Sequence, residues 1–130
     1  MKRTILLLVS ITFLLTGCKK NNVNPSEELV QWNISKVEGP TTGLVNETIS
    51  FDVYCPASSG CDYISEFSSD ENGDTIVIKA LGGTLKDSPC TMAAVPILAK
   101  YEFKTSNKGL YTLKFISRDN TIIEHIVTIQ

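Results

Sequence analysis

Four cysteines and a single histidine are the side chains of this 130-residue chain best suited to chemistry. Thiolates and imidazoles bind zinc and act as nucleophile or base, and each use requires a particular arrangement. The cysteines lack the paired C-x-x-C spacing of zinc sites, and nothing beside His125 supplies the nucleophile and the orienting group that a general base needs. We therefore expect no metal site, no cofactor and no enzymatic activity, and a structural or surface role for His125.

One acidic stretch has part of the spacing of a calcium-binding loop. Asp70, Asn72 and Asp74 follow one another at intervals of two, as the first ligands of such a loop do. The sixth position of the loop requires glycine and is Thr75, and the twelfth requires glutamate and is Leu81. The stretch therefore predicts a hairpin turn and no cation site.

The first cysteine, Cys18, ends an apolar leader. Lys2 and Arg3 give the leader a positive start, and residues 5–15 are almost wholly apolar. This order is typical of a secretory signal, and an apolar run of about a dozen residues is shorter than the roughly 20 that span a bilayer as a helix. We therefore expect residues 1–17 to be removed from the mature protein.

The last residues of the leader, Leu15-Thr16-Gly17-Cys18, resemble the lipobox of bacterial lipoproteins. The resemblance implies cleavage between Gly17 and Cys18 and the attachment of lipid, such as palmitate, to Cys18. Two or three acyl chains anchor a protein stably, because each buried methylene contributes about 0.8 kcal/mol. We expect a cell-envelope protein whose partner is a bacterial membrane, the outer one in preference to the inner. The alternative is an ordinary secretory signal followed by an incidental cysteine.

The composition of the remaining chain fits one exported domain. Loss of the leader leaves 113 residues, enough to bury one core. Residues 18–28 are polar and show no hydrophobic period, which predicts a flexible tether in front of a domain over residues 29–130. Ten Lys and Arg remain against fourteen Asp and Glu, so we expect no nucleic-acid partner.

From residue 29 onward, alternating apolar and polar residues predict one strand after another. In residues 47–55, for example, Ile49, Phe51 and Val53 share a face with Cys55. Turn residues separate the segments, and the longest irregular loop covers residues 82–95. The spacing predicts an all-β fold, an antiparallel β-sandwich of about seven strands, with an open barrel as the alternative. The predicted strands cover residues 29–38, 47–55, 61–68, 75–81, 97–105, 110–117 and 121–129.

The segment from Gly109 to Phe115 resembles the penultimate strand of immunoglobulin-like domains. In those domains a tyrosine at this corner turns its hydroxyl back onto nearby backbone while its ring stays in the core. The resemblance implies an immunoglobulin-like sandwich in which Tyr111 is that residue.

Over most of residues 45–129 the chain also resembles a group of small lipoproteins of Bacteroidota-type bacteria. The resemblance implies an immunoglobulin-like fold and an envelope location, and it brings no activity with it. Cys55 departs from the pattern of this group, in which an apolar residue is usual at that position. The features that carry the resemblance are Gly60-Cys61, Cys90-Thr91, the run from Tyr101 to Lys104 and the run from Gly109 to Phe115.

With Cys18 lipidated, three cysteines remain, and only two of them can pair in an oxidising compartment. We favour a disulfide between Cys61 and Cys90, which would stabilise the fold by about 3 to 4 kcal/mol in the chain-entropy model and attach the long loop to a strand. A short ring between Cys55 and Cys61 is the main alternative. A bond between Cys55 and Cys90, or no bond, also remains open.

A further modification is suggested where the strand over residues 75–81 begins. Asp74-Thr75-Ile76 resembles the short O-glycosylation motif that Bacteroidota-type bacteria use on exported proteins. The resemblance makes Thr75 a candidate for sugar attachment.

The predicted anchor, the tether and the lack of a catalytic motif favour a binding or accessory module. Such a module would present its loops or a sheet edge to a protein or glycan of the envelope. A loop-presenting protease inhibitor is the alternative, with residues 82–95, which contain Cys90, as the inhibitory wedge. No sequence feature names the ligand.

Overall fold

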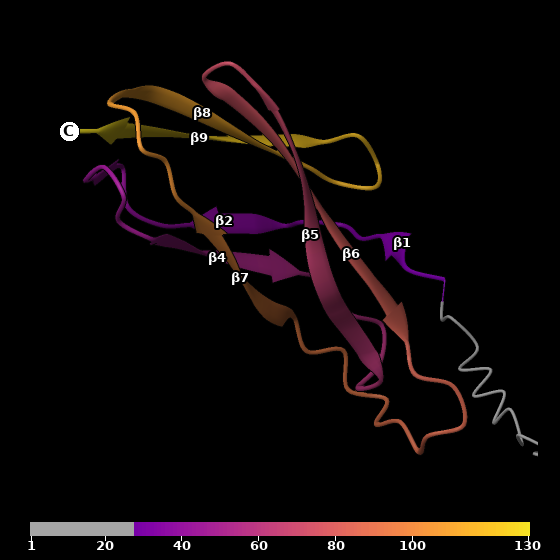
Figure 1. The fold of residues 1–130 in the computed structure, drawn as a ribbon. Coiled ribbons are helices and arrows are strands. Elements are labelled where there is room, and N and C mark those ends of the chain that lie inside the picture. The colour runs from indigo at the N-terminus through magenta and orange to yellow at the C-terminus, as the bar shows by residue number, and fades with distance from the viewer. Residues whose placement is uncertain (1–27) are drawn as a thin grey trace, which may run out of the picture.

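The computed structural model describes residues 28–130, which form two β-sheets packed face to face (Figure 1). The larger sheet has six strands and the smaller has three, which confirms the predicted immunoglobulin-like β-sandwich. Within residues 28–130 there is no helix, and hence none long and apolar enough to cross a membrane. The strands are β1 (Val30–Gln31), β2 (Lys36–Glu38), β3 (Thr42–Gly43), β4 (Ile49–Cys55), β5 (Asp62–Asn72), β6 (Thr75–Thr84), β7 (Ile97–Phe103), β8 (Gly109–Ile116) and β9 (Ile122–Ile129).

The larger sheet is built around β6. One edge of β6 pairs along its whole length with β5, while its other edge pairs with β8 near its start and with β1 near its end. Strand β9 continues the sheet beyond β8, and β3 lies beyond β9. Asn72 and Thr75 face each other across a two-residue turn in which Gly73 has a φ of 61°, so the predicted hairpin is confirmed.

The smaller sheet places β4 between β2 and β7. The predicted alternation along β4 is confirmed, because Phe51, Val53 and Cys55 are fully buried while Ser50 faces solvent. From the opposite sheet Phe115 packs against Phe51, with ring centroids 6.3 Å apart. The apolar faces of the two sheets thus form one core, as burial of alternate residues requires.

Tyr111 of β8 makes the tyrosine corner that was predicted for it. Its hydroxyl donates a hydrogen bond of 3.1 Å to the backbone oxygen of Asn107, four residues upstream, and lies 3.1 Å from the hydroxyl of Thr105. Tyr111 is 6% exposed, and its ring packs against Phe103. One side chain therefore both fills the core and fixes the connection between β7 and β8.

The first predicted strand, residues 29–38, is wrong as a single element. The chain crosses from the larger sheet to the smaller one within it: the backbone N–H of Trp32 donates to Ala80, and that of Ser35 donates to Tyr54. Ile34 lies buried at the crossing, and its N–H donates to the hydroxyl of Ser117. The split of this segment and the short strand β3 raise the number of strands from about seven to nine.

Five of the seven strand pairings are antiparallel, as predicted, and two are parallel: β3 with β9, and β6 with β8. The second arises because β6, and not β5, lies next to β8. Strand β6 buries alternate residues from Ile76 to Gly82, whereas most of β5 beyond Phe67 is polar and exposed. The polar strand takes the sheet edge, where exposed charges also discourage pairing with other chains.

Candidate binding site

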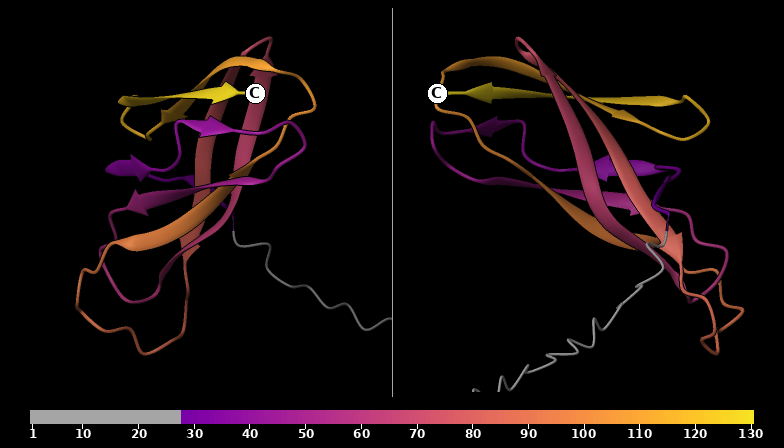
Figure 2. Two further views of the ribbon diagram at one scale, coloured as in Figure 1. Left: turned by 90° about the vertical axis from the view of Figure 1, so that its left-hand side faces the viewer. Right: turned by 45° about the vertical axis from the view of Figure 1, so that its right-hand side comes forward.

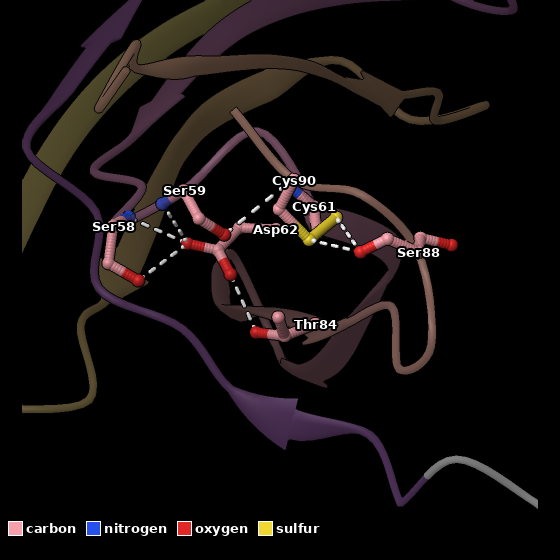
Figure 3. Close-up of a disulfide and its surroundings, with 7 residues drawn as sticks. All are labelled: Ser58, Ser59, Cys61, Asp62, Thr84, Ser88 and Cys90. Carbon is pink, nitrogen blue, oxygen red and sulfur yellow. Dashed lines mark hydrogen bonds between the residues drawn. A yellow bond between two sulfur atoms is a disulfide. The ribbon is translucent and has the colours of Figure 1, made fainter. Parts of the chain in front are cut away.

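Two connections lie side by side at one end of the sandwich, residues 56–61 and residues 85–96 (Figure 2). We call this the loop end. A disulfide joins Cys61 to Cys90 there, with Cα atoms 5.2 Å apart (Figure 3). This confirms the pairing favoured from the sequence and rules out both pairings of Cys55, which is a free thiol with no exposed surface.

Backbone hydrogen bonds reinforce the disulfide on both sides. The N–H of Gly60 donates to the oxygen of Thr91 at 2.9 Å, and the N–H of Leu85 donates to the oxygen of Cys61 at 2.9 Å. A Cβ atom at Gly60 would overlap the side-chain oxygen of Thr91, so glycine is needed for this close approach. The longer connection is therefore held near its start and near its middle.

The carboxylate of Asp62 organises the shorter connection (Figure 3). Its Oδ2 accepts hydrogen bonds from the backbone N–H of Ser58 at 2.6 Å, from the Ser58 hydroxyl at 2.8 Å and from the N–H of Ser59 at 3.0 Å. Its Oδ1 accepts one from the Thr84 hydroxyl at 2.6 Å. The Thr84 bond, followed by those from Ser58 and Ser59, holds the pKa of Asp62 well below its ordinary value despite burial. The ionised carboxylate of Asp62 thus links the end of β6 to residues 56–61 through hydrogen bonds.

Beyond the disulfide the longer connection presents apolar side chains to solvent. Met92 is 92% exposed and Val95 is 66% exposed, although the chain next to them is fixed at Cys90. Exposed apolar side chains on an otherwise constrained loop are a common form of contact surface.

Beside these connections Trp32 lines two hollows in the surface. The first is lined by Trp32, Asn33, Arg118 and residues 56–58. The second is lined by Trp32 and Arg118 again, together with Glu28, Val30, Lys86 and residues 83–84. The indole N–H donates to the backbone oxygen of Pro56 at 2.7 Å, and the backbone N–H of Arg118 donates to the oxygen of Trp32 at 3.2 Å. We call this pair of hollows the Trp32 cleft.

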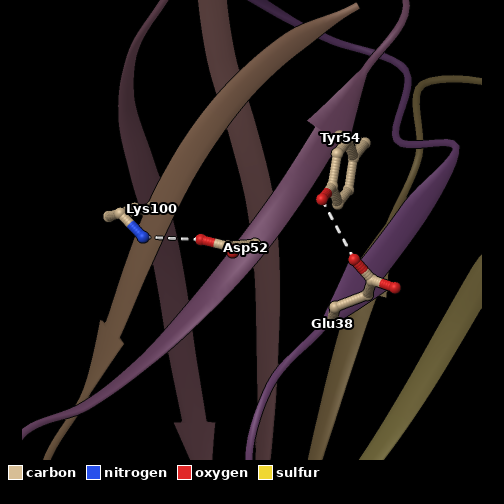
Figure 4. A network of polar contacts seen from close by, with 4 residues as sticks. All are labelled: Glu38, Asp52, Tyr54 and Lys100. Carbon is tan, nitrogen blue, oxygen red and sulfur yellow. Dashed lines mark hydrogen bonds and ion pairs between the residues drawn. The ribbon is translucent and has the colours of Figure 1, made fainter.

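The outer face of the smaller sheet also carries charges, but they are paired with one another (Figure 4). Lys100 lies 2.7 Å from Asp52, and the Tyr54 hydroxyl donates to Glu38 at 3.0 Å. Lys36 forms an ion pair with Glu38 and lies over the ring of Tyr54. These groups satisfy each other and leave few free partners for a ligand.

The remaining residues singled out in the sequence have local roles or lie outside the described part of the chain. The ring of His125 packs edge-on against Phe51, with Nε2 3.1 Å from the oxygen of Pro40, in keeping with the structural role predicted for it. Burial raises the pKa of the Cys55 thiol to about 11, so it is scarcely ionised at neutral pH. Thr75 is half-buried at the start of β6. Within residues 28–130 no cluster of His, Cys, Asp and Glu could hold a metal. The predicted leader, the cleavage between Gly17 and Cys18, and the lipid on Cys18 fall outside residues 28–130.

Sequence reasoning missed three residues of this end: Trp32, Asp62 and Arg118. For Asp62 a local signal exists, since Ser58 and Ser59 lie four and three residues before it in a turn, where hydroxyls and backbone N–H groups commonly bind a carboxylate. Trp32 and Arg118 are far apart in the sequence of the domain. They lie close together only because β1 and β8 follow each other along one edge of β6.

Comparison with known proteins identifies the family. The chain belongs to the ORF11 beta-sandwich domain family, whose model matches residues 51–129. No curated protein matches the chain. No solved structure matches it either.

Proposed function

We propose that this chain is a lipid-anchored envelope protein of a Bacteroidota-type bacterium, with a sandwich that serves as a binding module without enzymatic activity. The leader and the lipobox-like Leu15-Thr16-Gly17-Cys18 support the anchor. The family to which the chain belongs is described as a β-sandwich domain, and that description names no activity.

The anchor is tested by feeding cells an alkyne analogue of palmitate and measuring its incorporation into the protein. We expect incorporation into the wild type and none into Cys18→Ser. Cys55→Ala is the matched control, because it removes a different thiol and should keep the label. Equal labelling of wild type and Cys18→Ser would refute lipidation at this residue.

The observation that carries the binding role is the exposure of Met92 on a covalently fixed loop. An apolar side chain that is 92% exposed contributes little to the fold, whereas a partner could bury it without first having to order the loop. The contact surface we assign to the module is therefore residues 85–96 together with the neighbouring Trp32 cleft.

A photoreactive amino acid placed at position 92 tests this surface in intact cells. We expect a discrete crosslinked product, with a protein or a glycan, from position 92. Position 110 is the control, because Leu110 is also apolar and is 59% exposed but lies at the other end of the domain, where β8 begins. Equal products from both positions, or none from position 92, would contradict a binding role for the loop end.

A second candidate function is inhibition of a protease by the same loop, and the disulfide at Cys90 favours it. A protease cleft accepts an extended, rigid segment, and Met92 lies only two residues beyond the fixed Cys90. We would expect the purified protein to slow at least one serine or cysteine protease, and Met92→Asp to abolish the effect. Undiminished rates across a panel of such proteases would remove this candidate.

A further inference from the structure

The Trp32 cleft has the size of a small-ligand site. The two hollows have volumes of about 330 and 410 Å³, within the roughly 300 to 1,000 Å³ typical of such sites. Trp32 is half-buried and forms a wall of both. Its N–H is already bonded to Pro56, so what it offers a ligand is the apolar surface of the indole.

The cleft also has unpaired positive charge. Within residues 28–130, Lys36, Lys100 and Lys114 have acidic partners within 4 Å, whereas Arg118 and Lys86 have none. One carboxylate, that of Glu28, lines the second hollow, and none lines the first. An unpaired guanidinium in a hollow that an aromatic residue also lines is suited to an anionic group, which it can bind through two parallel hydrogen bonds.

The other polar groups suit a ligand rich in hydroxyls. Ser58 and Thr84 each donate their hydroxyl proton to Asp62, so their oxygens remain available as acceptors. The Asn33 side-chain oxygen accepts from Ser117, which leaves its NH₂ group as a donor. Both hollows therefore combine donors and acceptors on fixed side chains.

We propose that the Trp32 cleft binds an anionic saccharide, with a sugar ring against the indole and the carboxylate or sulfate of that sugar on Arg118. This proposal rests on the binding role proposed above, and it specifies the class of ligand that the module binds. A peptide fits less well, because β1, which lies at the sheet edge here, is only two residues long and offers little backbone for a peptide to pair with.

Trp32 is the only tryptophan of the chain, so its fluorescence reports directly on the cleft. The full-length protein in detergent is titrated with trigalacturonate, with a sulfated galactose trisaccharide and with neutral galactotriose, which share the ring but differ in charge. Acetate and sulfate ions serve as charge-only controls. We expect a saturable change with one of the two anionic trisaccharides, at least tenfold weaker binding of galactotriose, and no change with either ion. The anionic trisaccharide that binds identifies whether the acid is a carboxylate or a sulfate.

Two substitutions test the assigned contacts. Arg118→Gln should weaken binding of the anionic trisaccharide at least tenfold, while Lys108→Gln, which removes a positive charge at the other end of the domain, should not. Trp32→Phe, followed by calorimetry because the signal is lost, should also weaken binding at least tenfold. Both target residues are at least partly exposed, and circular dichroism verifies that the variants are folded.

The proposal is overturned if no saccharide changes the fluorescence, if galactotriose binds as tightly as the anionic forms, or if Arg118→Gln binds like the wild type. It is also overturned if the ions alone reproduce the change. Crosslinking of a protein from position 92 would persist in all these cases, so the binding role and its ligand class can fail separately.

Discussion

The two ends of the sandwich hold their connections by different means. Between β7 and β8, residues 104–108 are fixed by Tyr111, whose ring is in the core and whose hydroxyl reaches the backbone of Asn107. At the loop end, residues 85–96 are fixed by the Cys61–Cys90 disulfide and by backbone bonds to Gly60 and Cys61.

The difference follows from the length of each connection. A short turn can be closed by one side chain that the core already positions, and it leaves little surface free. A longer loop has too few apolar residues inside the core to be fixed by packing, so a covalent bond takes that role. The loop end can therefore keep Met92 and Val95 exposed at little cost to stability.

Removal of the disulfide should have the largest effect. Replacing both Cys61 and Cys90 with alanine should lower the free energy of unfolding by about 3 to 4 kcal/mol, because the unfolded chain gains the entropy of the opened loop. Urea denaturation followed by circular dichroism measures this. A reductant should destabilise the wild type similarly and leave the double variant unchanged. A loss below about 1 kcal/mol would mean that the loop end is held by its hydrogen bonds, like the other end.

Asp62→Asn should come next, with a loss of about 2 kcal/mol at pH 7, because four hydrogen bonds to a charged acceptor are weakened or broken. The loss should depend on pH. The pKa of Asp62 is lowered by folding, so its contribution is complete above the unfolded value of about 3.9 and disappears as the pH falls below it. Wild type and variant should therefore approach each other in urea denaturation between pH 5 and pH 2. A gap that stays constant with pH would exclude the charge as its cause.

Tyr111→Phe should cost about 1 kcal/mol, since it keeps the ring and removes only the hydroxyl and its bond to Asn107. Tyr54→Phe is the matched control, because its hydroxyl binds Glu38 on the exposed outer face of the smaller sheet. Thermal unfolding should show a lower midpoint for Tyr111→Phe and an unchanged one for the control. Equal midpoints for the two variants would mean that the corner is fixed by packing alone.

Met92→Asp should have the smallest effect, a change in stability within about 0.5 kcal/mol, because a side chain that is 92% exposed makes few contacts to lose. Denaturation by urea measures it. A larger loss would show that the exposed part of the loop supports the fold, and would weaken the case for a contact surface there.

What could be predicted from the sequence was mostly local. The alternation of β4, the turn at Gly73 and the corner at Tyr111 depend on residues close together in the chain. The Cys61–Cys90 pairing was also accessible, because few cysteines were available to pair.

What the sequence did not reveal depends on long-range placement. The strand predicted over residues 29–38 has a continuous pattern, yet its two halves belong to different sheets, with Ile34 buried where the chain crosses between them. The position of β6 beside β8 reflects the polarity of β5 along its full length. The last residues of β5 were assigned to a turn from the sequence, so the full length of this strand was not predicted. Trp32 and Arg118 lie close together because of the crossing between the sheets and the position of β6 beside β8. Neither feature could be predicted from the sequence, so this pair could not be predicted either.

The place of β9 has a consequence for the order in which the domain can form. This strand lies between β8 and β3, and the N–H of Thr128 donates to the oxygen of Thr41, from the start of the domain. The larger sheet therefore cannot close until residues 122–129 have left the ribosome, and pairings between segments so distant in the chain form slowly. A chain with this arrangement stays open while its earlier residues are synthesised, which is the state that the proposed export through a membrane channel would require.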